Sequence, residues 1–306
     1  MLQPSMVFRP GKLPIAPSNV YVARGKAEET LKKSLQRGFI PLIYGEYGVG
    51  KTSMARHIVT ELYGDENLIN IESVSGKSLN DIFARCLERF SLFSWQKTEA
   101  LKEEKNPSPG LFGFLFKKSS RKSSSEPARP DPSLFEQNSI SSANFVTDSR
   151  IIEICEHYGA VLLLDEIHKA SEELLDEIVR FIKSYGNANC EKFKIIILGT
   201  SSEATKLIHK DPGIDRLIED IPLPPMCHKE VNYVVEQGMR NLAIGIVNEA
   251  KERILSISGG YPNILQYLCL ESSEYAFGRK SRKLDVCDVE NALTDYVENF
   301  AGDGGT

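Results

Sequence analysis

Short apolar runs alternate with helix-spaced patterns over the first two thirds of the chain. The runs predict strands, because a strand buried on both faces reads as a nearly continuous apolar segment. They lie at 39–44, 67–72, 160–164, 193–198 and 217–221. Helices are expected between them, at 27–36, 53–62, 79–87, 149–158, 171–182 and, briefly, 203–209. This alternation predicts an α/β fold with a parallel five-stranded sheet flanked by helices.

The pattern changes after the proline-rich segment 222–225, because only helical spacing remains beyond it. Helices are expected there at 227–241, 248–258, 261–276 and 285–298. At the other end, prolines at positions 4, 10, 14 and 17 favour an extended backbone. We therefore expect three parts: an extended N-terminal segment at 1–20, an α/β core at 21–224 and a C-terminal helical lid at 225–306.

The alternation of strands and helices stops between about 97 and 147. Residues 117–130 are rich in serine, proline and basic side chains, and this composition predicts a mobile surface insertion. An aromatic run at 111–116 precedes them. It either folds back onto its own domain or docks on a partner or a membrane surface, and the sequence leaves both interpretations open.

Composition excludes some classes of protein. The 306 residues are 41% hydrophobic with a formal net charge of −5, so bulk charge does not favour nucleic-acid binding and a local basic patch would have to supply it. The six cysteines form no Cys-x-x-Cys pair, which is typical of reduced thiols and not of a disulfide framework or a zinc site. No apolar stretch approaches the roughly 20 residues of a membrane span. We therefore expect a cytoplasmic protein without a transmembrane segment.

A glycine-rich turn separates the first expected strand from the next helix. It consists of Gly45, Glu46, Tyr47, Gly48, Val49, Gly50, Lys51 and Thr52, and Ser53 continues into the helix. The spacing is that of a P-loop, in which backbone N–H groups and a helix N-terminus bind a polyphosphate. Lys51 is expected to contact the β- and γ-phosphates, and the Thr52 hydroxyl is expected to bind Mg²⁺.

Two carboxylates follow the buried strand expected at 160–164. Asp165 and Glu166 have the form of a Walker B segment. Because parallel strands end at the same edge of a sheet, Asp165 is expected beside Thr52, where it would bind the metal. Glu166 would then be the base that polarises the attacking water.

A third polar position is Thr200, which follows the strand expected at 193–198. Its hydroxyl would lie at the same sheet edge and could bind the γ-phosphate or orient the water. The alternative is an ordinary helix N-cap.

In this order of parts, the chain resembles the AAA+ superfamily over roughly residues 20–298. The resemblance implies a P-loop core with a helical lid, ATP and ADP as ligands, Mg²⁺, and hydrolysis of ATP. The segment 22–26 resembles the one that lines the adenine pocket in that family, which implies Arg24 as a nucleotide contact. The segment 214–217 resembles the one that supplies an arginine finger to a neighbouring subunit, which implies Arg216 in catalysis and a homo-oligomer in the ATP state. An arginine paired with Asp215 or Glu219 is the alternative for Arg216.

The turn at 258–263 departs from the ring-forming members of the superfamily, because no arginine follows its two glycines. Its Gly-x-Pro form looks more like STAND and archaeal-type ATPases, with origin-recognition and transposition-helper ATPases as the nearest ring-like relatives. Pro262 is thereby implied as a nucleotide contact. Proline is also favoured in the first turn of any helix.

Three functions are compatible with these motifs. The first is a Mg²⁺-dependent ATPase that couples its nucleotide state to self-assembly and to a protein partner. The second is a STAND-like switch, in which nucleotide exchange is the output and hydrolysis is slow. The third is a DNA-associated loader or helper ATPase that uses the basic run at 117–122, so nucleic acid stays open as a partner.

Overall fold

The computed structural model describes residues 2–11, 20–90, 147–200 and 211–301. Most of the expected insertion, with its aromatic run at 111–116 and its basic run at 117–122, lies outside these residues. The short helix expected at 203–209 also lies outside them.

Five parallel strands form the central sheet, in the order β2-β3-β4-β1-β5. They are β1 (Ile40–Tyr44), β2 (Leu68–Ile71), β3 (Val161–Leu164), β4 (Lys194–Gly199) and β5 (Ile218–Pro222). Each falls within one residue of its predicted run, and the predicted parallel five-stranded sheet flanked by helices is confirmed. Because all strands point the same way, the segments that follow β1, β3 and β4 meet at one edge.

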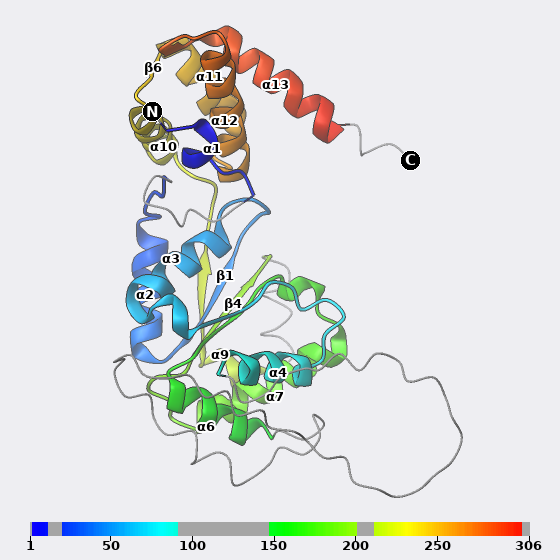
Figure 1. Cartoon of the computed structure of the whole chain (residues 1–306). Coiled ribbons are helices and arrows are strands. Elements are labelled where there is room, and N and C mark those ends of the chain that lie inside the picture. Colours follow the sequence, from blue (N-terminus) through cyan, green and yellow to red (C-terminus); the bar gives the residue numbers. More distant parts are fainter. Residues whose placement is uncertain (1, 12–19, 91–146, 201–210, 302–306) are drawn as a thin grey trace, which may run out of the picture.

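Helices cover both faces of the sheet (Figure 1). One face packs on α2 (Lys26–Arg37) and α3 (Lys51–Tyr63), and the other on α4 (Leu79–Arg89), α6 (Asp148–Tyr158) and α7 (Glu172–Asn187). Alternate residues of β3 belong to the two apolar clusters, with Leu163 on the α3 side and Leu162 on the α7 side. Short helices η1 (Asp65–Asn67), η2 (Ile167–Lys169) and α9 (Pro212–Asp215) complete the core.

The C-terminal region forms a lid with its own apolar cluster. It consists of α10 (His228–Leu242), β6 (Gly245–Ile246), α11 (Asn248–Ser258), α12 (Pro262–Gly278), β7 (Lys283–Leu284) and α13 (Val286–Ala301). Figure 1 shows the lid at one end of the core, with the far end of α13 running away from the other lid helices. The pairing of β6 with β7 was not predicted, because two-residue strands carry no periodic signal.

The N-terminal segment differs from its predicted extended conformation. It contains a one-turn helix, α1 (Pro4–Val7), because Pro4 occupies the first helical turn, where its fixed φ angle and missing N–H are tolerated. The phenyl ring of Phe8, fully buried, lies against the backbone of α10 at Gly238, where an added Cβ would approach it to 2.1 Å. Val7 and Phe8 thus belong to the apolar cluster of the lid.

Candidate functional site

Two positions of the glycine-rich turn between β1 and α3 have room only for glycine. Gly48 has a φ angle of +77°, and a Cβ there would lie 2.6 Å from the side-chain oxygen of Asn263. A Cβ on Gly45 would lie 2.3 Å from the carbonyl oxygen of Leu223. Glycine is therefore required both by the left-handed backbone and by the close approach of the lid and of the core-to-lid connection.

A cavity of about 570 Å³ opens above this turn. The P-loop and the segment after β3 form its floor, with Lys51, Thr52, Asp165 and Glu166. The lid contributes Pro262, Asn263, Leu265 and Gln266, and the N-terminal segment contributes Val7 and Arg9. Most of the predicted P-loop residues and both Walker B residues therefore line one cavity between core and lid.

A direct hydrogen bond joins the two motifs. The Thr52 hydroxyl donates to Oδ2 of Asp165 across 2.7 Å. Asp165 is 8% exposed, and this burial raises the pKa of its carboxyl group despite the Thr52 hydrogen bond. A buried carboxylate and a hydroxyl are hard oxygen ligands, which is the donor set that Mg²⁺ prefers. These two residues therefore fit a magnesium ion.

The Lys51 ammonium group turns back onto its own loop. Its Nζ donates to the carbonyl oxygens of Gly45 at 2.9 Å and of Glu46 at 2.8 Å. Burial lowers the pKa of Lys51, against the opposing effect of Asp165. A phosphate oxygen would offer this ammonium group a stronger, charge-assisted partner than either carbonyl.

Glu166 stands in the left-handed region, with a φ angle of +55°. Its carboxylate accepts a hydrogen bond from Lys169 Nζ at 2.8 Å, and this bond lowers the pKa of Glu166. A glutamate rarely adopts this backbone conformation, and such outliers cluster at functional sites. The strained residue lines the cavity with its carboxylate in an ion pair.

No protein-family model and no curated protein matches the chain, but solved structures match it in fold. A Walker-type ATPase of Pyrococcus abyssi shares 13% identity with a TM-score of 0.63 and covers 95% of this chain and 77% of that one. The Aeropyrum pernix ORC2 protein, in ADPNP–ADP complexes, shares 13% identity with a TM-score of 0.61, and the match covers 94% of this chain and 72% of that one. The Thermotoga maritima RuvB Holliday junction branch migration motor shares 17% identity with a TM-score of 0.54, and the match covers 89% of this chain and 67% of that one.

The chain shares the fold of these structures, a P-loop core with a parallel sheet and a C-terminal helical region. The likeness at these identities concerns the fold, and it agrees with the predicted order of P-loop, Walker B strand and helical lid. Among the described helices, none is long and apolar enough to cross a membrane.

Arg24, expected from the AAA+ resemblance as a nucleotide contact, lines the cavity but uses its guanidinium within the protein. It donates to the carbonyl oxygens of Val49 in the P-loop and of Pro224 before the lid. Its Nε lies 3.5 Å from the Glu230 carboxylate in the first turn of α10. At 7% exposure, Arg24 braces the P-loop, the core-to-lid connection and the lid against one another.

The remaining predicted residues lie at different distances from the cavity. Pro262 is close, since its ring lies 3.5 Å from where a Cβ on Gly50 would stand. Thr200 is half-buried directly after Gly199, which lines the cavity. Arg216 is exposed and precedes β5, at the sheet edge opposite the P-loop. The fold therefore does not bring Arg216 to the site of its own chain.

The structure adds residues that the sequence did not single out. His168 lines the cavity and contacts the Tyr47 hydroxyl through Nε2, and Lys169 pairs with Glu166. The sequence did offer one signal for a place near the site, because these two residues follow Asp165 by three and four positions. The Tyr261 hydroxyl, from the lid, donates to Glu46 of the P-loop. No sequence pattern indicates that contact, because 215 positions separate its partners.

Proposed function

We propose that this protein is a Mg²⁺-dependent ATPase of the AAA+ type that couples its nucleotide state to self-assembly and to a protein partner. The observation that carries the proposal is the 2.7 Å hydrogen bond from Thr52 to Asp165 within a cavity floored by a P-loop. A P-loop alone supports phosphate binding, but a buried carboxylate beside its threonine supports a metal–nucleotide complex.

The residues of the cavity have separable roles. Thr52 and Asp165 would hold Mg²⁺, which supplies positive charge to the β- and γ-phosphates when bound. Lys51 leaves the carbonyls of Gly45 and Glu46 to contact the phosphates. Glu166 leaves Lys169 and accepts the proton of the attacking water, and a positioned base of this kind contributes roughly 10²–10⁴-fold to the rate. Thr200 orients the water or the γ-phosphate from the end of β4.

The proposed self-assembly rests on Arg216. Its exposure at the edge opposite the P-loop supports a role toward the site of a second copy. An arginine finger supplied in trans is worth about 10³–10⁵-fold in rate. Among the described residues, no carboxylate lies within ion-pair distance of Arg216, so the alternative pairing with Asp215 or Glu219 finds no support.

A nucleotide-exchange switch is the second candidate. The Glu166–Lys169 ion pair and the contacts of Tyr261 and Pro262 with the P-loop support a state that holds nucleotide and turns it over slowly. Tightly retained ADP with nearly single-turnover hydrolysis would favour this candidate.

A DNA-associated ATPase is the third candidate, because RuvB, which this chain resembles in fold, is described as a Holliday junction branch migration motor.

The experiment is a titration with ATP and ADP, with Mg²⁺ or with a chelator, followed by a hydrolysis assay. The parent is expected to bind both nucleotides and to hydrolyse ATP only with Mg²⁺. Lys51→Ala is expected to lose nucleotide affinity, whereas Lys33→Ala, which removes an exposed lysine of α2, should match the parent. Equal affinity of Lys51→Ala and the parent would contradict the assignment of the phosphate site.

A further inference from the structure

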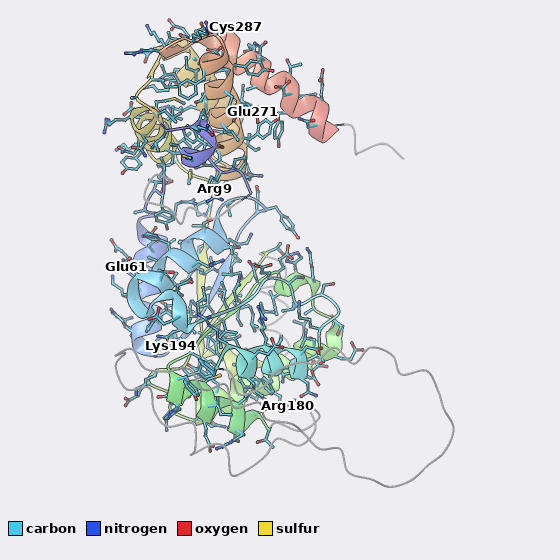
Figure 2. The ribbon with its side chains drawn as sticks, in the orientation of Figure 1. Arg9, Glu61, Arg180, Lys194, Glu271 and Cys287 are labelled. Carbon is cyan, nitrogen blue, oxygen red and sulfur yellow. The ribbon has the colours of Figure 1, made fainter. Side chains whose placement is uncertain are left out.

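Strand β2 forms one edge of the sheet, because β3 is its only neighbour among the described strands. The sheet lies between two helical layers, and Figure 2 labels Glu61 on α3 in one layer and Arg180 on α7 in the other. A strand at the edge of a sheet leaves the backbone N–H and C=O groups of its outer side unpaired. The outer side of β2 is therefore a place where another strand can pair.

The unpaired backbone groups of this edge include those of Asn70. The carbonyl oxygen of Ile71 accepts a hydrogen bond of 3.0 Å from the backbone N–H of Asp165, so the backbone groups of Ile71 face β3. Successive residues of a strand direct these groups to opposite sides, so the N–H and C=O of Asn70 point away from the sheet. Within the described part of the chain, neither group has a hydrogen-bond partner.

A cavity of about 390 Å³ lies against this edge. One wall consists of Asn70, Ile71 and Glu72, and Lys77 lies at the turn that follows. The other wall is one face of α4, with Asp81, Ala84, Arg85 and Glu88 at helical spacing. We call this cavity the β2–α4 groove.

Most charged side chains of the β2–α4 groove already have partners within the chain. Arg85 and Glu88 form an ion pair of 3.1 Å. Asp81 accepts hydrogen bonds at the N-terminus of α4, and the Lys77 ammonium group donates to a backbone carbonyl of the turn after β2. These four side chains therefore contribute little unpaired charge to the groove.

Two hydrogen-bond acceptors of the same groove are unpaired. Among the described residues, Glu72 has no hydrogen-bond or ion-pair partner, and the side-chain oxygen of Asn70 is buried without a donor. A buried acceptor without a donor costs free energy. Asn70 and Glu72 also line the nucleotide cavity, so the two cavities share this wall. The wall fits a ligand that brings a cationic donor.

We propose that an extended segment of a protein partner adds as a strand to the outer edge of β2 and places a lysine or arginine on Asn70 and Glu72. The N–H and C=O of Asn70 pair with the backbone of that segment, and alternate side chains of the segment enter the β2–α4 groove. The proposal deepens the partner engagement of the proposed function. Only the link from the partner to the nucleotide rests on that function, because docking itself needs no ATP.

The test begins with random dodecapeptides displayed on phage, selected on the full chain without nucleotide and then measured by calorimetric titration. Selected peptides are expected to carry a lysine or arginine that cannot be replaced by glutamate without at least about a tenfold loss of affinity. N-methylation of alternate peptide amides should cause a similar loss in one of its two registers, because the methyl group removes the donors that face β2.

Variants of the chain separate the backbone of the edge from its side chains. Asn70→Pro removes the outward N–H, a change that edge strands tolerate, and should weaken peptide binding at least about tenfold. Asn70→Val keeps that N–H and should bind more tightly than Asn70→Pro. Glu72→Gln should bind about 5- to 10-fold more weakly than the parent, and Glu249→Gln, exposed on the lid, should bind like the parent. If Asn70→Pro does not fold, the N-methylated peptides decide the same point on the parent.

Hydrogen exchange, measured residue by residue, reports on the edge itself. In the free chain, the N–H of Asn70 should exchange faster than that of Ile71, which faces β3, and a selected peptide should slow the exchange of Asn70. Slow exchange of Asn70 in the free chain would mean that a segment of this chain covers the edge. Protection that grows with protein concentration would mean that a second copy covers it. Either result would overturn the proposal.

Two other results would also overturn the docking site. One is a selection that enriches no peptide, and the other is a set of peptides that bind Asn70→Pro and the parent equally well, with or without N-methylation. The titration with ATP is a separate measurement. A chain that binds peptide but no ATP would overturn the proposed ATPase function and leave the docking site, whereas the reverse result would leave the ATPase function.

Discussion

Lys169 donates a hydrogen bond to the Glu166 carboxylate across 2.8 Å, so the candidate base is held in an ion pair. The two side chains are 43% and 27% exposed, so solvent weakens this ion pair. Hydrolysis through Glu166 must first break this pair. In the proposed mechanism, this contact would therefore be a small brake on turnover.

Removing the ammonium group should release this brake. Lys169→Met is expected to raise the ATP hydrolysis rate at saturating ATP by up to about fivefold and no more, because an exposed ion pair is weak. Steady-state phosphate release measures the effect. Lys192→Met removes a lysine on the opposite sheet edge as the control, and a rate in Lys169→Met at or below that of the parent would exclude the brake.

Glu156, near the end of α6, has a carboxyl group that makes the stability of the protein depend on pH. Burial would raise the pKa of this carboxyl group, but backbone N–H groups of Phe193, Lys192 and Glu191 donate to it, and its pKa is lowered overall from the ordinary 4.5. A carboxyl group with a lowered pKa in the folded state stabilises the protein above its unfolded pKa, and this contribution disappears as the pH falls through the folded pKa.

Glu156→Ala is accordingly expected to cost about 1–2 kcal/mol of unfolding free energy at pH 7. The difference from the parent should shrink as the pH falls below about 4.5. Urea denaturation at several pH values measures it. Glu153→Ala, which removes an exposed carboxylate on the same helix, should show little effect at any pH, and a pH-independent loss in Glu156→Ala would contradict the linkage.

Arg24 should contribute to stability more than to nucleotide contact. Arg24→Ala leaves the carbonyls of Val49 and Pro224 without their donors and Glu230 without its partner, so a loss of about 3 kcal/mol in unfolding free energy is expected. Chemical denaturation without nucleotide measures this loss. Arg37→Ala, at the exposed end of α2, is the control, and a parent-like stability of Arg24→Ala would exclude the bracing role.

Arg216 should act only between copies of the chain. The specific hydrolysis rate of the parent is expected to rise with protein concentration, and Arg216→Ala should remain at the low-concentration rate while it binds ATP normally. Sizing with ADP and with a slowly hydrolysed ATP analogue tests the same point. A rate in Arg216→Ala that rises with concentration as in the parent would exclude the finger.

The sequence predicted the parts of the fold that depend on local pattern. The strand at 161–164 was evident because both of its faces are buried, and the glycines of the P-loop were evident because their spacing follows from phosphate geometry. The conformation of residues 4–7 was missed because proline was weighed as a helix breaker, whereas Pro4 begins a helix.

Contacts across the cavity could not be predicted in the same way. Arg24 was placed near the nucleotide by resemblance, but its partners Val49 and Pro224 depend on where the lid connection crosses the P-loop. The pairing of Arg9 with Gln266 spans 257 positions and has no local signature. The sequence therefore predicted the chemical groups of the phosphate site, whereas the contacts between the lid and residues 2–11 are evident only in the structure.

Hydrolysis of ATP by Glu166→Gln under single-turnover conditions tests the central claim most directly. Glutamine keeps the shape of the side chain but cannot accept the proton, so ATP should bind within about threefold of the parent while hydrolysis falls about 100-fold or more. Glu29→Gln, which changes an exposed carboxylate of α2, should hydrolyse ATP like the parent. Parent-like hydrolysis in Glu166→Gln would contradict the assignment of Glu166 as the base of an ATPase site.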